Sequence, residues 1–326
     1  MSLVDAVVVS YNSRESLAAC VTPLAGAEDV HVIVVDNAST DGSLEAVRDL
    51  PVVAMRRSVN AGFAAGCNAG WRAGSAPYVL LLNPDATIAP EGLRRLVRVL
   101  EEDGSVGAVA PRIEEEDGSL HFSQRRFPRL RSTYARAFFL HRFAPAASWA
   151  DEVVRDEERY SQTGSPEWAS GACLLLRRSA LEEIEGLDEG FFLYCEDDDL
   201  CRRLWQAGHA VRYDPEAVCI HQGGASAPRS SLLPLLAASR IRYAQKHRST
   251  AGAGLERIGV LLNGLTHALV ARGGVAARAG HVRSIRVAVS RRPRAVALAA
   301  SGLSAVTPAF PDHVATTGAR DAARRA

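Results

Sequence analysis

Short apolar runs alternate with stretches of helical periodicity over the first 110 residues, and this alternation restricts the possible folds more than any other feature. The apolar runs are Val4–Val9, Val30–Val35, Val52–Met55, Tyr78–Leu82 and Val106–Ala110. Runs that are apolar at nearly every position are typical of parallel strands covered on both faces. We therefore expect an α/β fold, namely a doubly wound, mostly parallel sheet with helices on both faces.

Helices are expected between these strands, at 14–25, 40–49, 61–74 and 90–103. Ser39 or Thr40 would cap the second helix, and Pro90 would open the fourth. These connections are long enough to cross from one parallel strand to the next, so they agree with the predicted sheet.

Residues 112–167 break this regular pattern. Arginines crowd beside Phe127 and Pro128 in this segment, at positions Arg125, Arg126, Arg129 and Arg131. We expect an irregular insertion here, or a pair of short helices over the sheet. Regular elements return as a strand at 172–176, a turn and helix within 187–208, and a strand pair within 211–221.

Charge divides the chain near residue 228. Residues 1–228 carry a formal net charge of −12, whereas residues 229–326 carry +13. The basic part predicts helices at 229–247, 255–271 and 275–290. We therefore expect an α/β domain at 1–227, an Arg-rich helical segment at 228–300 and a loose tail at 301–326.

The basic segment is expected to meet an anionic membrane surface, because its cationic residues alternate with Leu, Val and Ala as in basic amphipathic helices. These residues are Arg229, Arg240, Arg242, Lys246, Arg248, Arg257, Arg272, Arg278, Arg283 and Arg286. Two alternatives remain open: arginine is this chain's usual cation, and a basic segment can neutralise the acidic domain. Nucleic acid is not an expected partner, since Tyr243 and Phe310 are the only aromatic residues available for stacking there.

The sequence also indicates a compartment. No charge-free apolar run reaches the ~20 residues of a membrane span, and no charged leader with an apolar core opens the chain. The six cysteines show neither C-x-x-C spacing nor the density of a disulfide scaffold. We expect a cytoplasmic protein with reduced thiols, held peripherally at the inner face of the plasma membrane.

Polar residues follow three of the predicted strands. They are Ser10-Tyr11-Asn12, Asp36-Asn37 and Asn83-Pro84-Asp85. Ligands of open parallel sheets bind outside the carboxyl ends of the strands. The three endings together predict a polar crevice with two carboxylates along one sheet edge, although Asn and Asp also start turns at such positions.

Six short motifs now carry a resemblance to family-2 glycosyltransferases. In order they are V-V-V-S-Y-N at 7–12, V-V-D-N-A-S-T-D-G at 34–42, N-A-G-F-A-A-G-C-N-A-G at 60–70, N-P-D at 83–85, W-A-S-G-A at 168–172 and F-F-L-Y-C-E-D-D-D-L at 191–200. The chain most resembles the bacterial rhamnosyltransferase-like branch, over roughly residues 3–225.

The resemblance implies a GT-A fold, with the catalytic domain at 1–227, and an inverting, metal-dependent reaction. The expected donor is a nucleotide-diphosphate sugar, with dTDP-L-rhamnose as the best guess and another UDP- or dTDP-sugar as the alternative. The expected acceptor is a hydroxyl of a polyprenyl-linked saccharide or an oligosaccharide in cell-envelope polysaccharide synthesis.

The resemblance also assigns residues to the donor. It implies that Ser10, Tyr11, Asn12 and Asp36 bind the nucleotide, with Asp36 accepting the N3–H of uracil or thymine. It implies that Asn60 and Asn68 line the nucleotide-sugar. The glycines between them would let the backbone approach the ligand, or they serve only helix packing.

Asn83-Pro84-Asp85 stands where the family often carries Asp-x-Asp. The resemblance implies that Asp85 binds Mg²⁺ or Mn²⁺ across the two phosphates, with Asn83 toward the ribose, and that His221 can add a nitrogen ligand. Such cations take hard oxygen ligands and keep waters and phosphate oxygens. The alternative for His221 is a structural role.

Four consecutive carboxylates, Glu196 to Asp199, begin the predicted helix within 187–208. On a helix Asp197 shares a face with Leu200, Cys201 and Leu204, so it should face the interior, while Asp198 and Asp199 point progressively outward. The family motif also places its base second. We predict Asp197 as the catalytic base, with Glu196 and Asp198 as alternatives in the same pocket.

The resemblance makes Trp168, Ser170 and Gly171 the wall between donor sugar and acceptor. An indole offers an apolar plane to a sugar ring, although Trp168 could instead be a core residue. Two rivals to this function are a sugar nucleotidylyltransferase and a non-catalytic glycan-binding or scaffold protein. A Rossmann dehydrogenase is not expected, because no G-x-G-x-x-G follows the first strand.

Overall fold

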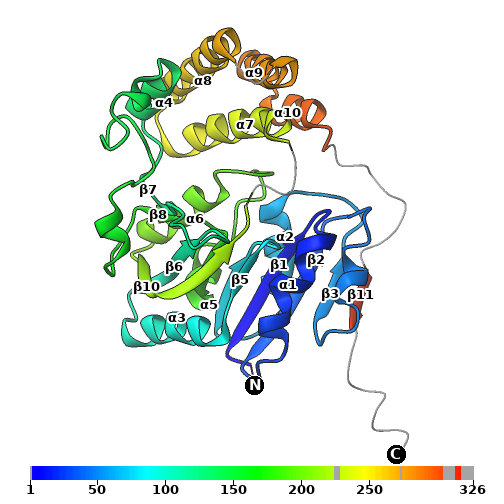
Figure 1. The fold of residues 1–326 in the computed structure, drawn as a ribbon. Helices are drawn as coiled ribbons and strands as arrows, with labels where there is room; N and C mark the ends of the chain where they lie inside the picture. The colour runs from blue at the N-terminus through cyan, green and yellow to red at the C-terminus, as the bar shows by residue number, and fades with distance from the viewer. Residues whose placement is uncertain (1, 224–227, 272–273, 304–312, 317–326) are drawn as a thin grey trace, which may run out of the picture.

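A computed structural model describes residues 2–223, 228–271, 274–303 and 313–316 of the 326-residue chain (Figure 1). Its centre is a sheet of nine strands in the order β11-β3-β2-β1-β4-β9-β6-β10-β5. The strands are β1 (Val4–Ser10), β2 (Val30–Asp36), β3 (Val53–Arg56), β4 (Tyr78–Leu82), β5 (Ala86–Ile88), β6 (Val106–Glu114), β9 (Cys173–Arg177), β10 (Ala210–His221) and β11 (His313–Thr316).

Parallel pairing joins β3, β2, β1 and β4, and also β6 and β10. The strand β9 runs antiparallel between β4 and β6, and β5 and β11 pair antiparallel at the two edges. The predicted α/β fold is confirmed. Because β1, β2 and β4 are parallel, their carboxyl ends lie at the same side of the sheet, as the predicted crevice requires.

Helices cover both faces of the sheet, as the continuous apolar runs predict. They are α1 (Arg14–Ala25), α2 (Phe63–Ala73), α3 (Pro90–Glu102), α5 (Arg178–Glu183) and α6 (Glu196–Gln206). Val4, Ala6 and Val8 of β1 share a core with α1 and α3, whereas Val7 and Val9 share the opposite core with α2, α5 and α6. Successive side chains of a strand point to opposite faces, so one apolar strand supplies both cores.

The insertion at 112–167 contains short elements, as expected. They are β7 (Gln124–Arg125), α4 (Leu130–Ala137), η2 (Leu140–Arg142) and η3 (Glu157–Tyr160), where η denotes a 3₁₀ helix, and β7 pairs with β8 (Trp168–Ala169). The helix α4 leaves the sheet and packs against the C-terminal helices (Figure 1).

The C-terminal helices form a layer beyond the carboxyl ends of the strands (Figure 1). They are α7 (Arg229–His247), α8 (Thr250–Val270), α9 (Gly274–Val289) and α10 (Pro293–Ser301). Their core includes Leu235, Ile241 and Val287, and Phe192 of the loop before α6 packs into it. None of the helices in the described ranges is both long and apolar enough to cross a membrane.

The predicted helix at 40–49 is wrong. The structure has only a 3₁₀ turn, η1 (Leu44–Val47), with Ser43 before it rather than a cap at Ser39 or Thr40. The Asp41 carboxylate accepts hydrogen bonds from the backbone N–H of Arg14 and of Ser43. Short polar side chains that bind nearby backbone groups compete with helix formation in this way.

Other elements at the end of the chain also differ from the prediction. The strand pair expected within 211–221 is the single strand β10, with a register shift between Asp214 and Val218. The helix α10 and the strand β11 were not predicted. The rest of the expected loose tail, at 304–312 and 317–326, lies outside the described residues.

Candidate active site

The ends of β1 and β2 hold a group of buried polar atoms. Ser10 lies opposite Asp36 in the register of the two strands, and Asn37 follows. Ser10 Oγ, Asp36 Oδ1 and Asn37 Oδ1 are buried without a hydrogen-bond partner in the described part of the chain. Burial raises the pKa of Asp36. Because buried polar atoms are normally hydrogen-bonded, this group is a candidate binding site for a polar ligand.

The rim of this group is a loop held by Asn12. The Asn12 backbone N–H donates to Ser39 Oγ, and its side-chain oxygen accepts the Thr40 N–H, each at 2.9 Å. Asn12 has a positive φ of 53°. Asn12 therefore fixes the 39–40 loop, and the half-buried Tyr11 stands beside it at the mouth of the site.

Asn60 and Asn68 both use their side chains within the fold. Asn60 Oδ1 accepts the N–H of Gly62 at 3.0 Å and shapes the turn that enters α2. Asn68 donates to Leu187 O and Glu189 and accepts from the Leu187 N–H and Trp71 Nε1. An amide side chain has two donors and about two acceptor sites, so Asn68 holds the loop at 187–189 rather than facing a donor.

Asp85 and His221 meet at the edge of the sheet where β4 ends and β10 ends. Their atoms Oδ1 and Nε2 lie 3.2 Å apart, and Asn83 Nδ2 is 3.5 Å from the same nitrogen. Neighbouring ligands of an octahedral cation with bonds of about 2.1 Å lie about 3 Å apart. The carboxylate and imidazole therefore fit one Mg²⁺ or Mn²⁺ that completes its shell with phosphate oxygens and water. No cluster of three or more such ligands occurs within the described ranges.

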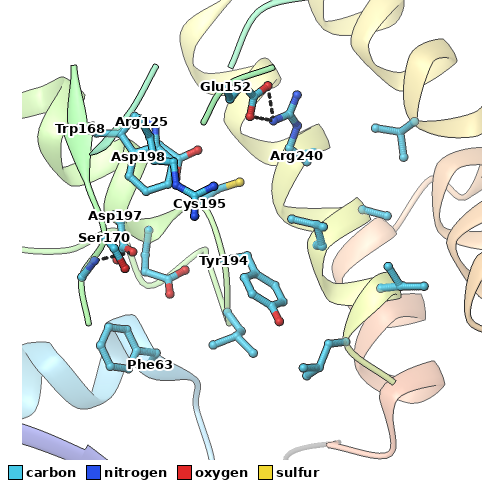
Figure 2. Close-up of a pocket in the computed structure, with 18 of the residues that line it drawn as sticks. Phe63, Arg125, Glu152, Trp168, Ser170, Tyr194, Cys195, Asp197, Asp198 and Arg240 are labelled. Carbon is cyan, nitrogen blue, oxygen red and sulfur yellow. Dashed lines mark hydrogen bonds and ion pairs between the residues drawn. The ribbon is translucent and has the colours of Figure 1, made fainter. Parts of the chain in front are cut away.

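A cavity of about 540 Å³ lies between this edge of the sheet and the C-terminal helices (Figure 2). One wall contains the predicted base Asp197 and the five residues predicted for the donor and acceptor pocket: Trp168, Ser170, Gly171, Glu196 and Asp198. The opposite wall is apolar and comes from α7 and α8, through Leu232, Leu233, Leu236 and Val260.

Asp197 is held at this cavity by a backbone amide. The Gly171 N–H donates to Asp197 Oδ2 at 2.9 Å, and a Cβ at position 171 would overlap the carboxylate. Burial raises the pKa of Asp197 to about 6, although the Gly171 hydrogen bond and the charge of Arg125 act to lower it. The carboxylate is therefore held at the cavity with a pKa near the pH range in which a general base works best.

Asp198 and Asp199 were predicted to point outward, and this prediction is wrong. Glu196, Asp198 and Asp199 are 5%, 4% and 0% exposed, because the loop before α6 and the helix α7 cover this turn. Burial raises the pKa of Asp198 to about 7, with help from the Asp197 charge, and it also raises that of Glu196. Glu196 Oε2 is buried without a partner in the parts of the chain described.

Asp199 belongs to the fold rather than to the cavity. Its carboxylate lies 2.8 Å from Arg203 Nε, 2.7 Å from Lys246 Nζ and 2.7 Å from His247 Nε2. Burial acts to raise the pKa of Asp199, but the hydrogen bond from His247 and the charges of Arg203 and Lys246 outweigh it and lower the pKa. Asp199 thus joins α6 to α7.

The basic helices direct several of their charges inward. Arg242 and Lys246 pair with Asp188, Arg240 pairs with Glu152 and Glu256, and Arg248 pairs with Glu256. For these four residues the structure supports the alternative that the basic segment neutralises acidic groups of the protein, and it corrects the expectation that they contact lipid. Arg229 and Arg272 lie where side chains are not described.

Sequence reasoning assigned no role in the site to Arg125, Glu152 or Arg240, which also line the cavity. Glu152 and Arg240 face each other at 2.6 Å on its far side (Figure 2). The two residues are 88 positions apart in the sequence. The only sequence signal for such a pair is that both segments are rich in charged residues.

Comparison with known proteins gives the family. The model of Glycosyl transferase family 2 matches residues 5–185. An N-acetylglucosaminyl-diphospho-decaprenol L-rhamnosyltransferase of Mycobacterium tuberculosis is 33% identical over 234 residues, which are 68% of this chain and 75% of that protein. Rhamnosyltransferase WbbL of Escherichia coli is 33% identical over 44% of this chain and 52% of its own length.

Solved structures share the fold. A mannosyltransferase of Pyrobaculum calidifontis in complex with GDP-Man and Mn²⁺ has a TM-score of 0.51 at 19% identity, covering 92% of this chain and 86% of its own. GalNAc-T7 with UDP, GalNAc and Mn²⁺ has a TM-score of 0.52 at 15% identity, covering 77% of this chain and 51% of its own. The chain belongs to glycosyl transferase family 2 and is a glycosyltransferase of GT-A fold.

Proposed function

We propose that this glycosyltransferase moves L-rhamnose from dTDP-L-rhamnose to a hydroxyl of a lipid-linked or oligosaccharide acceptor, with inversion and with a divalent cation, in cell-envelope polysaccharide synthesis. The two rhamnosyltransferases at 33% identity support the sugar. The printed name of the first, with its diphospho-decaprenol, supports a polyprenyl-linked acceptor. Transfer from another UDP- or dTDP-sugar is the alternative.

The observation that carries the proposal is the position of Asp197. Its carboxylate lines a cavity that also reaches Asn83 at the sheet edge and the apolar wall of α7. In our proposal Asp197 accepts the proton of the acceptor hydroxyl as that oxygen attacks the anomeric carbon. A base works best when its pKa lies near the working pH, and a pKa of about 6 meets this condition.

The donor would occupy the crevice at the ends of β1, β2 and β4. Asp36 Oδ1 has no hydrogen-bond partner among the described residues, and it suits the N3–H of thymine or uracil, with Ser10 and Tyr11 beside it. Asp85 and His221 would hold the cation, which supplies charge stabilisation to the departing diphosphate when bound. Two solved structures of the same fold are complexes that contain Mn²⁺, and they support this use of a metal ion.

The acceptor would enter the cavity with its lipid along α7 and α8. A sugar with a diphosphate and a polyprenyl chain has a polar end and an apolar end. The cavity has the same division, between the carboxylates of α6 and the leucines of α7. In this division of labour residues 1–227 perform catalysis, and residues 228–300 meet the acceptor's lipid.

Peripheral contact with the cytoplasmic face of an anionic membrane completes the proposal. Exposed apolar side chains gather on three segments and form what we call the apolar end: Phe138, Leu140, Phe143, Leu269, Val270 and Val275. These segments meet, because the Phe139 ring lies 4.3 Å from that of His267 and Thr266 donates to Ala137 O. The exposed Arg142 and Arg278 flank this end, and such a pairing of apolar and cationic groups favours anionic lipid.

Turnover with a panel of donors tests the proposal. The purified chain is given N-acetylglucosamine on a short polyprenyl diphosphate as the acceptor and one of three donors, dTDP-L-rhamnose, UDP-glucose or UDP-galactose. Nucleotide release should be fastest with dTDP-L-rhamnose, and it should require Mg²⁺ or Mn²⁺. The product linkage, read by NMR, should have the opposite anomeric configuration to the donor. A preference for a UDP-sugar would contradict dTDP-L-rhamnose as the donor, and turnover in EDTA would contradict the need for a metal ion. Retention of the anomeric configuration would contradict the proposed role of Asp197 as the base.

The variant Asp85→Ala tests the cation site. Turnover should be lost, and dTDP should bind the variant more weakly than the parent in Mn²⁺, because the diphosphate is held through the ion. Without metal the two proteins should bind dTDP alike. Calorimetric titration of dTDP with and without Mn²⁺ measures both. Equal binding in Mn²⁺ would take Asp85 out of the site.

A further inference from the structure

Arg125 is an arginine without a partner at the centre of the cavity. It lies on β7, lines the cavity, and reaches toward α7 between Trp168 and Cys195 (Figure 2). Its Nε is buried without a hydrogen-bond partner, and no ion pair within 4.0 Å joins it to a carboxylate in the described ranges. The centre of the Trp168 ring lies 5.9 Å from Arg125 Cζ.

The other partly buried arginines of this segment are engaged. Arg126 donates to Val153 O at 3.1 Å, Arg129 pairs with Glu167 at 2.6 Å, and Arg112 pairs with Glu114 at 2.7 Å. Arg131 also has no ion-pair partner among the described residues, but its side chain is exposed to solvent. Among the partly buried arginines of the insertion, the lack of a partner is therefore particular to Arg125.

A partly buried guanidinium without an ion pair is costly, because it loses hydration without a compensating anion. Burial lowers the pKa of Arg125, yet an arginine side chain keeps its proton in proteins. The charge of Arg125 acts on Asp197 at longer range, but its Nε has no hydrogen-bond partner among the described residues. The contact with Trp168 offsets only part of this cost. The described residues therefore place no anion in contact with Arg125.

We propose that the Arg125 guanidinium binds a phosphate group of the lipid-linked acceptor. This inference rests on the proposed function. The planar fork of a guanidinium matches two phosphate oxygens. Arg125 also stands between Asp197, where the reacting sugar would lie, and the apolar wall of α7 (Figure 2). Sugar, diphosphate and lipid follow one another in the same order in a polyprenyl-diphosphate acceptor. Arg125 would then orient the acceptor without contacting the reacting atoms.

Binding of farnesyl diphosphate, a lipid diphosphate without a sugar, tests the inference apart from activity. The parent should bind it, Arg125→Gln should bind it at least 10-fold more weakly, and Arg125→Lys should lie between them. The control Arg126→Gln should bind like the parent. No binding by the parent, or equal binding by Arg125→Gln, would overturn the proposal whatever the enzyme's donor proves to be.

The second arm separates the acceptor's phosphate from the donor's. Calorimetric binding of dTDP with Mn²⁺ should be the same for the parent and Arg125→Gln, whereas weaker binding by the variant would give Arg125 to the donor diphosphate. In turnover, KM should rise at least 10-fold for the sugar on a lipid diphosphate and stay within 3-fold for the same sugar as an octyl glycoside. Equal losses on both acceptors would contradict a phosphate contact.

Thermal unfolding distinguishes this role from a structural one. Removing an unpaired buried charge should leave Tm unchanged or raise it, so Arg125→Gln should be at least as stable as the parent. A lower Tm in Arg125→Gln than in Arg126→Gln would show that Arg125 serves the fold, and would overturn the proposal.

Discussion

At the level of single residues, Asp197 shows how the surroundings of a carboxyl group set its pKa. The Gly171 amide fixes one oxygen, and burial beside two further carboxylates keeps the proton affinity high. Burial also raises the pKa of its two acidic neighbours, Glu196 and Asp198. Asp197 differs from them in its hydrogen bond from the Gly171 backbone amide, which is the reason why our proposal makes it the base.

Replacing Asp197 by Asn should remove the base while preserving shape. General-base catalysis is worth about 10²–10⁴-fold, so transfer should fall by that factor while dTDP binding stays constant. The parent's kcat should fall as pH drops below about 6, because the protonated carboxyl cannot accept a proton, and this dependence should vanish in Asp197→Asn. Steady-state rates from pH 5 to 8 measure both effects. Transfer above a tenth of the parent's rate would move the role to Glu196 or Asp198.

The variant Gly171→Ala tests the position of the base without changing any charge. The added methyl would overlap the Asp197 carboxylate and displace it, and a shift of about 1 Å at a reacting group costs about 10²-fold in rate. We expect kcat to fall by that order with little change in dTDP binding. Gly104→Ala is the matched control, since a methyl there meets nothing within 4 Å. Similar rates for both variants would separate Gly171 from catalysis.

At the level of elements, α6 is anchored from the side opposite the cavity. Asp199 binds Arg203 of its own helix and both Lys246 and His247 of α7. The helix that starts with Glu196 and Asp197 is thereby fixed to the layer that carries the apolar wall. This contact and Phe192, which packs among α7 and α9 residues, hold the two walls of the cavity together.

Asp199→Asn should destabilise the protein, because Arg203, Lys246 and His247 lose their fully buried carboxylate partner. Removing one partner of a buried pair costs about 3 kcal/mol. Since the pKa of Asp199 is lowered in the fold, its contribution is present above the unfolded pKa of about 3.9 and is lost as pH falls through the folded pKa. Urea unfolding of the parent and variant at pH 7 and pH 4 measures the difference. Equal unfolding midpoints at pH 7 would exclude this anchoring role.

At the level of the whole molecule, several of the cationic side chains that the sequence predicted to face a membrane form ion pairs inside the fold. The apolar end offers a different surface for membrane contact. Phe143, Leu269 and Val275 are 85%, 80% and 88% exposed. This end lies on the C-terminal helices and on the insertion that packs against them. A lipid-linked acceptor would thus meet the enzyme on the layer that forms the apolar wall of the cavity.

Liposome sedimentation tests this contact. The chain should sediment with acidic vesicles at low salt and less at 1 M salt, because charges at a surface are screened within about 3 Å there. Phe143→Asp with Leu269→Asp should reduce binding about 10-fold or more, through loss of buried apolar area. Val289→Asp, at an exposed apolar site at the other end of α9, is the control. Equal binding by the double variant and the control would exclude the apolar end.

The sequence alone determined the features that depend on local periodicity and on strand order. Continuous apolar runs specified strands covered on both faces, and the polar residues after them specified the crevice with Ser10, Asp36 and Asp85. The position of Asp197 beside Leu200 and Cys201 also followed from the helical repeat. These features involve residues within a few positions of one another, or at the ends of neighbouring strands, so the sequence pattern contains them.

Tertiary packing alone decided which polar groups are satisfied and which are left for ligands. The sequence predicted that Asn68 lines the nucleotide-sugar and that Asp199 points outward, yet both bind residues more than 40 positions away in the chain. Arg125 resembles its arginine neighbours in sequence but lacks their partners among the described residues. The physical reason is that hydrogen bonds and ion pairs between distant segments depend on how the layers pack together. A local sequence pattern does not determine that packing.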